Sequence, residues 1–524
     1  MAQVPPLAHS AAACSSEPTV SEFEHQSTTL NCPPVRSKSS TPPTRRSTRL
    51  AAGISASADT SESARAYGAR LNFEPRTSRE AMQHPSAPLW RQAECKELSG
   101  LQQRGCYTRV LRSSLPRGAQ ILLSMWVYSD KESGPKARLV VLGNTESEDS
   151  KSSVDTYAST PPSAAVRMLI ALAAQMGYYV NVYDVAQAFI QADDLPQGYD
   201  LYVLPPAGVD EDPLYCWKLI KPLYGLAASP RMWADTLRSW LLTNGWTAVA
   251  GEDTLYSLES GSARLLLCFH VDDILVASNH QEALDDFKRQ LLQRFDAKDL
   301  GPVSTFLGIK VVRDYSLGTI SLSQTQLIED LLARHGLSDC NPTKTPLSPG
   351  CKLLASDRPE IPDPVLGRQY RDICGSLSYL ALWTRPDLAF TAQALACHMS
   401  NPGPVHMAHA WHALRYLRGT ANLSLTYSRQ QPSLANLLLG FADSDWASDP
   451  DTRRSVGAYV FILNGAAVAW SAKRQLSVAV STSEAEYMSA SRAANEAVWL
   501  QRLLAGLGVE QKLPTPIWED NGGC

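Results

Sequence analysis

Residues 265–277, LLLCFHVDDILVA, contain two apolar runs that meet at a pair of aspartates. The runs cover residues 265–270 and 274–277, and Asp272 and Asp273 stand between them. Apolar runs of strand length that are separated by a short polar turn are typical of a tight β-hairpin. The sequence therefore predicts a hairpin that carries two carboxylates at its tip.

A third aspartate follows a predicted helix and strand upstream of this hairpin. Residues 163–176 are apolar at helical spacing, with Pro162 before them and Gly177 after them. Residues 178–185 are typical of a buried strand, and Asp184 lies near its end. Neighbouring carboxylates at the edge of a core repel one another unless a cation lies between them, and Mg²⁺ prefers such oxygen ligands.

Two-metal nucleotidyl transfer needs carboxylates that come from separate strands. Asp184, Asp272 and Asp273 are therefore predicted as catalytic residues and as ligands of two Mg²⁺ ions, for which Mn²⁺ could substitute. An isolated Asp-Asp pair is more often an ordinary turn. The surrounding motifs must therefore decide between the two interpretations.

The C-terminal part of the chain carries a second set of acidic residues. The sequence predicts a strand at 437–443, a hairpin at 456–471 that turns at Asn464-Gly465, a helix at 481–507 and a strand at 515–520. Three acidic residues on three of these elements can converge on one metal pair. We favour Asp443, Glu486 and Asp520, with Asp445 and Glu484 as close alternatives.

Composition indicates a multidomain globular chain behind a polar N-terminal segment. The chain has 524 residues, a hydrophobic content of 44% and a net charge of −4, so it has no overall basic character of the kind that many nucleic-acid-binding proteins show. Residues 1–85 are rich in Ser, Thr and Pro, which is typical of a disordered linker. The eleven cysteines form no C-x-x-C pair, and we expect a reducing, intracellular location and no membrane span.

Six motifs in this order resemble the reverse transcriptases of Ty1/copia-type LTR retrotransposons. They are Lys136-Ala-Arg138-Leu139-Val140, Asp184-Val-Ala-Gln-Ala-Phe189, Leu223-Tyr224-Gly225-Leu226 with Pro230-Arg231 and Trp233, Val271-Asp272-Asp273, Lys298-Asp299-Leu300-Gly301 and Phe306-Leu307-Gly308. The resemblance covers residues from about Trp90 to the C-terminus. It implies a mixed α/β or α+β multidomain fold, in which a right-hand polymerase of fingers, palm and thumb precedes a truncated RNase H-like domain.

The resemblance also implies domain limits and further site residues. Residues 86–330 would form the fingers and palm, 331–435 the thumb or connection, and 436–524 the RNase H-like domain. Lys131 and Arg138 would face the incoming triphosphate, Phe189 would exclude a 2′-hydroxyl, and Tyr224 and Gly225 would line the nucleotide site. Phe306, Leu307 and Gly308 would form a strand that grips the primer.

The C-terminal segment resembles the RNase H domain of the same elements. Its matching motifs are Gly440-Phe-Ala-Asp443-Ser-Asp445-Trp446, Ser481-Thr-Ser-Glu484-Ala-Glu486-Tyr487 and Glu519-Asp520-Asn521. The resemblance implies a further helix with a fourth acidic residue, yet the sequence stops four residues after Asp520. We therefore expect impaired ribonuclease activity.

These observations predict an RNA-directed DNA polymerase that uses an RNA or DNA template with a primer, together with deoxynucleoside triphosphates. The alternative is a catalytically inactive, nucleic-acid-binding remnant of a decayed element. The resemblance implies a cytoplasmic location, with virus-like particles, or a nuclear one; the oligomeric state stays open. We interpret His406, His409 and His412, spaced three residues apart, as structural or surface residues rather than metal ligands.

Overall fold

The computed structural model describes residues 74–131 and 134–523, and only the backbone of Lys131. These residues all belong to the unit Arg70–Cys524. Among the helices of this described part, none combines the length and the apolar character that crossing a bilayer requires.

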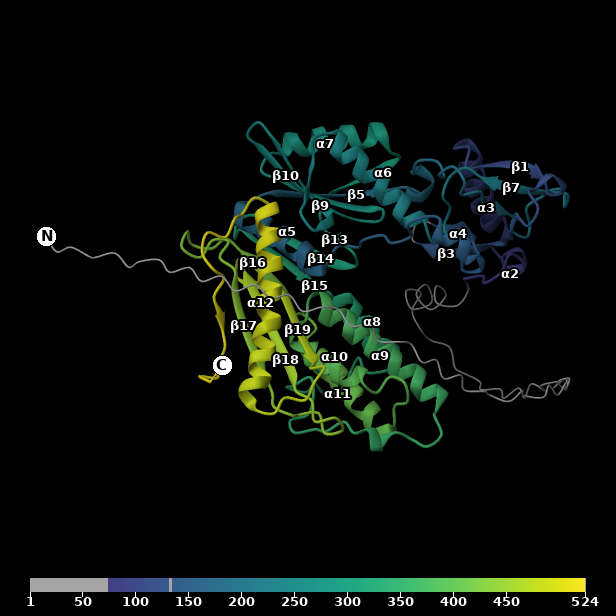
Figure 1. The fold of residues 1–524 in the computed structure, drawn as a ribbon. Coiled ribbons are helices and arrows are strands. Elements are labelled where there is room, and N and C mark those ends of the chain that lie inside the picture. Colours follow the sequence, from purple (N-terminus) through teal and green to yellow (C-terminus); the bar gives the residue numbers. More distant parts are fainter. Residues whose placement is uncertain (1–73, 132–133, 524) are drawn as a thin grey trace, which may run out of the picture. The chain divides into compact units, whose positions relative to one another are not determined.

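A six-stranded sheet forms the centre of one part of the described chain (Figure 1). Its strand order is β12-β5-β11-β10-β9-β8, and every neighbouring pair is antiparallel. The side chains alternate between two cores, one against α5 and the other against α6 and α7. The elements are α5 (Ser163–Met176), β5 (Tyr179–Val185), α6 (Ser229–Thr243), β8 (Thr247–Val249), β9 (Glu252–Ser260), β10 (Ala263–His270), β11 (Asp273–Ser278), α7 (Gln281–Arg294) and β12 (Ala297–Pro302).

The local signals around this sheet are confirmed. Helix α5 covers the predicted range, and Gly177 ends it in the left-handed region at φ 70°. Strands β10 and β11 form the predicted hairpin, with Val271 at φ 54° in its turn.

The N-terminal part consists of a small sheet of order β1-β7-β6-β2, a two-stranded hairpin β3-β4 and three short or medium helices. A single core joins them around Trp90, Trp126 and Trp217. The elements are α2 (Ser78–Gln83), α3 (Ala87–Gln103), β1 (Tyr107–Leu111), η1 (Arg112–Ser114), β2 (Ile121–Leu122), β3 (Ser124–Lys131), β4 (Gly134–Val141), η2 (Gly143–Thr145), α4 (Glu148–Ser152), η3 (Ala188–Gln191), β6 (Tyr202–Val203) and β7 (Tyr215–Leu219).

Helix α2 corrects the predicted linker at residues 1–85, most of which lies outside the described residues. The Thr77 hydroxyl accepts a hydrogen bond from the Glu80 N–H (3.2 Å), and Ala81 is fully buried in the same core as Trp90. A helix of one and a half turns is stabilised by such contacts rather than by its own pattern. Composition could therefore not reveal it.

The next part combines a four-stranded sheet with a helical cluster. The helices α8 to α11 share one core, and the sheet order is β13-β14-β15-β16. Helix α8 and the pairing of β15 with β16 both cross the predicted boundary at residue 330, so that boundary does not separate two packed units. The elements are β13 (Thr305–Phe306), β14 (Ile309–Asp314), β15 (Thr319–Ser323), α8 (Thr325–Arg334), η4 (Ala355–Asp357), α9 (Pro364–Trp383), η5 (Pro386–Leu388), α10 (Ala389–Ala396), α11 (Pro404–Thr420) and β16 (Leu425–Ser428).

The C-terminal part is a sheet of order β19-β18-β17-β20 with the long helix α12 lying across it (Figure 1). Asn464 and Gly465, both at positive φ, form the predicted turn. The Ser481 hydroxyl caps α12 by accepting from the Glu484 N–H (3.1 Å). The elements are β17 (Leu439–Ser444), β18 (Val456–Leu463), β19 (Ala466–Arg474), α12 (Thr482–Gly506) and β20 (Ile517–Trp518).

Candidate active site

The first group of predicted carboxylates lies where β5 and β11 pair. Asp184 stands directly opposite Asp273 in the antiparallel register. The Val185 N–H donates to the Asp272 carbonyl (2.8 Å), and the Trp233 indole donates to the Val271 carbonyl (2.6 Å). The strand pairing and an anchor from α6 therefore fix the tip of the hairpin beside Asp184.

The electrostatics of this group are those of carboxylates in one another's field. Burial is the main cause that raises the pKa of Asp273, and the negative charges of Asp272 and Asp184 raise it further. His270 lowers it. No ion pair between described residues joins any of the three aspartates to a basic side chain. The carboxylate oxygens of these three aspartates are not all within 4.8 Å of one another. Among the described residues, only a cluster in the C-terminal part meets that limit. The donor set nevertheless fits a hard divalent cation.

The predicted nucleotide-binding residues come together next to these aspartates. The Arg138 guanidinium lies 5.0 Å from the centre of the Tyr224 ring, and the Phe189 ring lies 4.9 Å from the same ring. Burial raises the pKa of Tyr224 to about 12, with smaller contributions from nearby charges that include Asp272 and Asp184. The side chain of Lys131 lies outside the described residues, so its predicted role stays a prediction.

Gly225 permits a close approach of two backbone segments at this point. It has φ 94°, and a Cβ added there would lie 2.0 Å from the Val141 carbonyl oxygen. The Val141 N–H donates to the Tyr224 carbonyl (2.8 Å), which joins β4 to the loop that carries Tyr224. The hairpin with Arg138 is therefore held directly against the loop that carries Tyr224.

A hydrogen bond between the buried Glu97 and the partly buried Gln187 was missed by the sequence analysis. Gln187 has φ 51°, and its amide donates to the Glu97 carboxylate (2.5 Å). Glu97 is 5% exposed, and burial raises its pKa. A polar residue between two alanines could have indicated a role for Gln187. Nothing in the sequence near Glu97 indicated that it is the partner. The pair fixes the turn between Asp184 and Phe189.

The segment predicted as a primer-gripping strand is a turn between two short strands, and its contact with a primer stays a prediction. Phe306 ends the short strand β13 and is 4% exposed in the core. Leu307 (φ 49°) and Gly308 (φ 72°) form the turn into β14. The Tyr379 hydroxyl donates to the Leu307 carbonyl (2.7 Å), which ties this turn to α9. Two successive left-handed residues produce a turn here instead of a strand.

The second group of predicted carboxylates forms a compact cluster. One oxygen from each of Asp443, Glu486 and Asp520 lies within 4.8 Å of the others. The strands β17 and β20 are parallel neighbours, and the Ser489 hydroxyl on α12 donates to the Asp443 carbonyl (2.8 Å). These contacts bring all three elements to one point.

Glu486 is the buried member of this cluster. Glu486 is 6% exposed, and its Oε2 atom has no hydrogen-bond partner among the described residues. Burial, followed by the charges of Asp443, Glu519 and Asp520, raises its pKa from 4.5 to about 7. A buried carboxylate oxygen without a partner beside two further carboxylates fits a cation-binding site.

The two alternative carboxylates lie outside this cluster and accept backbone hydrogen bonds. Asp445 accepts a hydrogen bond from the Val456 N–H (2.7 Å), and Glu484 accepts one from the Val480 N–H (2.6 Å). These contacts support the two strand ends and the start of α12. The geometry therefore favours Asp443 and Glu486 over Asp445 and Glu484.

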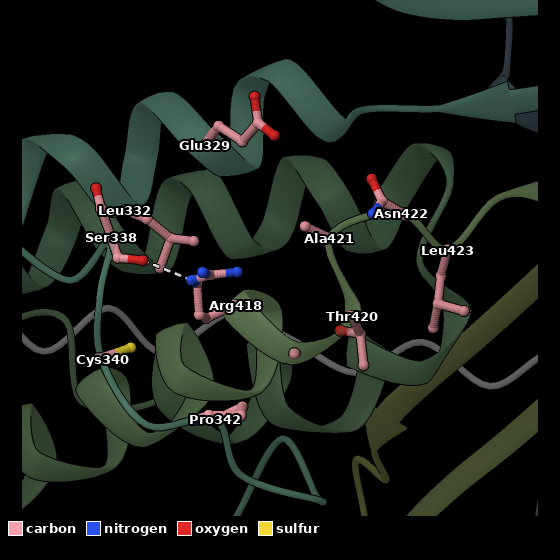
Figure 2. A pocket seen from close by; sticks show the side chains of 11 residues that line it. Glu329, Leu332, Ser338, Cys340, Pro342, Arg418, Thr420, Ala421, Asn422 and Leu423 are labelled. Carbon is pink, nitrogen blue, oxygen red and sulfur yellow. Dashed lines mark hydrogen bonds between the residues drawn. The ribbon is translucent and has the colours of Figure 1, made fainter.

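Two other features lie away from both groups. A cavity of about 740 Å³ lies between α8 and the end of α11, and Arg418 donates to the Ser338 carbonyl inside it (2.5 Å) (Figure 2). No predicted site residue lines this cavity. His406 is fully buried, accepts from the Gly403 N–H (2.9 Å) and contacts the Leu354 carbonyl (3.0 Å), which is a structural role.

The chain is similar to proteins of transposons. The family profile described as "Reverse transcriptase (RNA-dependent DNA polymerase)" matches residues 107–349. The retrovirus-related Pol polyprotein from transposon TNT 1-94 of Nicotiana tabacum is 32% identical over 84% of this chain, which spans about a third (33%) of that protein. The transposon Ty5-1 protein of Saccharomyces cerevisiae is 32% identical over 60% of this chain and 99% of that protein. A solved structure of the foamy viral protease-reverse transcriptase with double-stranded DNA aligns over 82% of this chain and 62% of that chain, with 11% identity and a TM-score of 0.47.

Proposed function

The chain belongs to the reverse transcriptase family of Ty1/copia-type Pol polyproteins, and from this premise we propose that it is an RNA-directed DNA polymerase. Its six-stranded sheet would be the palm, the N-terminal part with the β3-β4 hairpin the fingers, and the helices α8 to α11 the thumb or connection. The C-terminal part would be an RNase H-like domain. The observation that carries the proposal is the pairing of Asp184 with Asp273, with Asp272 on the adjoining turn.

Asp184 and Asp272 would hold the divalent ions, and Asp273 would support them. When bound, two Mg²⁺ ions would activate the primer 3′-hydroxyl and neutralise charge on the leaving pyrophosphate. The chain itself supplies position: β5 and β11 fix the carboxylates relative to each other before a substrate arrives, so little reorganisation is needed during the reaction.

Arg138, Phe189 and Tyr224 would bind the deoxynucleoside triphosphate. In the described part of the chain the Arg138 guanidinium makes no hydrogen bond to protein and lies over the Tyr224 ring, so its planar set of donors is available to phosphate oxygens. The Phe189 ring, packed at an angle against Tyr224, would occupy the space that a 2′-hydroxyl needs. The template and its primer would lie across the sheet between these residues and the helical cluster.

Primer extension on poly(rA) with oligo(dT) and Mg²⁺ tests this proposal. We expect extension by the parent and none by an Asp272→Asn, Asp273→Asn double variant. The matched control is Asp285→Asn, Asp286→Asn, which makes the same change at an exposed Asp-Asp pair on α7 and should extend normally. Primer-template binding without extension by the parent would instead favour a catalytically inactive remnant.

The second cluster supports ribonuclease activity as a second candidate function. Asp443, Glu486 and Asp520 would hold the metal ions, and the unpartnered Oε2 atom of Glu486 favours this assignment. Cleavage of the RNA strand of an RNA–DNA hybrid, measured for the parent and for Asp443→Asn, tests it. Loss of cleavage in the variant, with primer extension retained, would assign the two activities to separate groups. Equal cleavage by both proteins would exclude this cluster.

A further inference from the structure

Helix α5 is enclosed on every side. All residues from Ala164 to Ala174 are buried, including Arg167, which is 2% exposed. A helix that is buried all round must have packing partners on opposite faces. One face meets β10 and β11 of the six-stranded sheet, and another meets β15, β16 and β19. The C-terminal sheet therefore contributes directly to the core beneath the proposed polymerase site.

Three residues on one side of α5 form hydrogen bonds with segments near the C-terminus. Arg167, Ala171 and Gln175 are spaced four residues apart, so they lie on one side of the helix. The Arg167 guanidinium donates to the Val468 carbonyl (2.8 Å) and lies 3.9 Å from the centre of the Trp470 ring. Its donors also reach the carbonyls of residues 382 and 383 at the end of α9.

The same side of α5 makes further hydrogen bonds. The Asn464 amide donates to the Ala171 carbonyl (3.1 Å), and the Gln175 carboxamide oxygen accepts from the Gln430 N–H (2.7 Å). The hairpin β18-β19 and the segment after β16 are therefore hydrogen-bonded to α5 at successive turns. Buried polar groups of this kind specify one arrangement, because any other leaves them without partners.

The C-terminal end of α12 makes a second contact with the six-stranded sheet. The Ser257 hydroxyl of β9 donates to the Gly506 carbonyl (3.2 Å). A Cβ added to Gly506 would lie 2.5 Å from Val249 Cγ1 on β8, so only glycine fits without displacement. The β18-β19 hairpin and the end of α12 thus pack against the same core as α5.

We propose that residues 436–524 form a structural wall of the polymerase, so that nucleotide addition requires this folded part independently of its carboxylate cluster. This inference rests on the proposed polymerase function. Strand β5, which carries Asp184, follows α5 directly after Gly177 and Tyr178, and β11, which carries Asp273, pairs with β5. Displacing the wall from α5 therefore displaces the strands that position the aspartates.

A steric wedge in the full-length protein tests the proposal. Gly506→Val should lower the midpoint temperature of thermal unfolding, which we expect to be one transition, because overpacking forces packed elements apart. It should also reduce primer extension roughly tenfold at a temperature where the parent is fully folded. Ala505→Val is the matched control, since Ala505 is the exposed neighbour in the same turn, and it should change neither quantity. Adding Val249→Ala to Gly506→Val should restore both by making room for the new methyl groups.

Trp470→Phe is a milder second variant for the case in which the wedge prevents folding. It removes the hydrogen bond from the Trp470 indole to the Ala381 carbonyl (2.7 Å) and should lower the same transition together with primer extension. The proposal is overturned if residues 436–524 of either variant unfold in a separate transition at lower temperature and primer extension continues above that temperature. If the parent never extends a primer, the polymerase assignment fails. The unfolding of the parent still tests the wall: one transition supports it, and a separate transition for residues 436–524 contradicts it.

Discussion

Glu486→Gln is expected to stabilise the protein at pH 8 when divalent ions are chelated. Most substitutions of a buried residue destabilise, so the direction of this effect is specific. The Glu486 side chain is buried, one of its oxygens has no hydrogen-bond partner, and the carboxylates of Asp443 and Asp520 lie within 4.8 Å. The neutral amide removes the charge that this environment disfavours.

The magnitude follows from the pKa of Glu486. The rise from 4.5 to about 7 corresponds to at most about 3.5 kcal/mol, at about 1.4 kcal/mol for each pKa unit. Because the folded protein holds the proton more tightly than the unfolded chain, ionisation destabilises the fold. This destabilisation is absent below about pH 4.5, grows between pH 4.5 and 7, and is complete above pH 7.

Urea unfolding at pH 5 and pH 8, with EDTA and then with Mg²⁺, measures the effect. In EDTA the free energy of unfolding of the variant should exceed that of the parent by up to about 3.5 kcal/mol at pH 8 and by little at pH 5. Mg²⁺ at pH 8 should stabilise the parent more than the variant, since binding to the folded state alone raises stability and the variant keeps only the Asp184–Asp272 site intact. Glu484→Gln, an exposed change on the same helix, should not alter the response to Mg²⁺. A variant that is less stable than the parent at pH 8 in EDTA, or an equal Mg²⁺ effect on both, would refute the reasoning.

Three further substitutions test the polymerase site. Phe189→Val should increase ribonucleotide incorporation by about 10-fold or more, since the space for a 2′-hydroxyl opens; single-nucleotide extension measures it, and unchanged discrimination would contradict the role of the ring. Gly225→Ala should destabilise by at least about 2 kcal/mol in urea unfolding, because the added Cβ meets the Val141 carbonyl. The control is Gly261→Ala, at a positive φ with open space around it, and it should lower the free energy of unfolding by less. Equal losses in the two variants would show that the contact with the Val141 carbonyl is not the cause. Arg138→Lys should raise the KM for deoxynucleotides roughly tenfold with a smaller effect on kcat, since an ammonium lacks the bidentate donors; steady-state kinetics checks this, and a fall in kcat alone would argue for a role in the chemical step.

The features that the sequence predicted correctly depend on local signals. The limits of α5 follow from its apolar period between Pro162 and Gly177, and the β18-β19 turn follows from Asn464-Gly465. The resemblance to Ty1/copia-type reverse transcriptases is confirmed, because it rests on several motifs in a fixed order. Local chemistry and motif order therefore sufficed for the family and for the main elements.

The features that the sequence did not predict depend on contacts between distant segments. Glu97 and Gln187 are 90 positions apart, and no local pattern marks Glu97 as the partner of Gln187. The turn at Leu307 and Gly308 has its anchor in Tyr379, 72 positions away from Leu307. Burial of this kind is decided by the tertiary fold, which a single sequence does not display.

The hydrogen bond between Arg167 and the Val468 carbonyl has a consequence for synthesis of the chain, because 301 positions separate the two residues. At about 5–20 residues per second, a ribosome needs roughly 15 to 60 s to cover that interval. During this interval β15 and β16 are synthesised first, whereas the part of α5 that meets β19 stays without its partner until the end. This contact of α5 is therefore completed last, and synonymous codons between the two positions set how long it stays open.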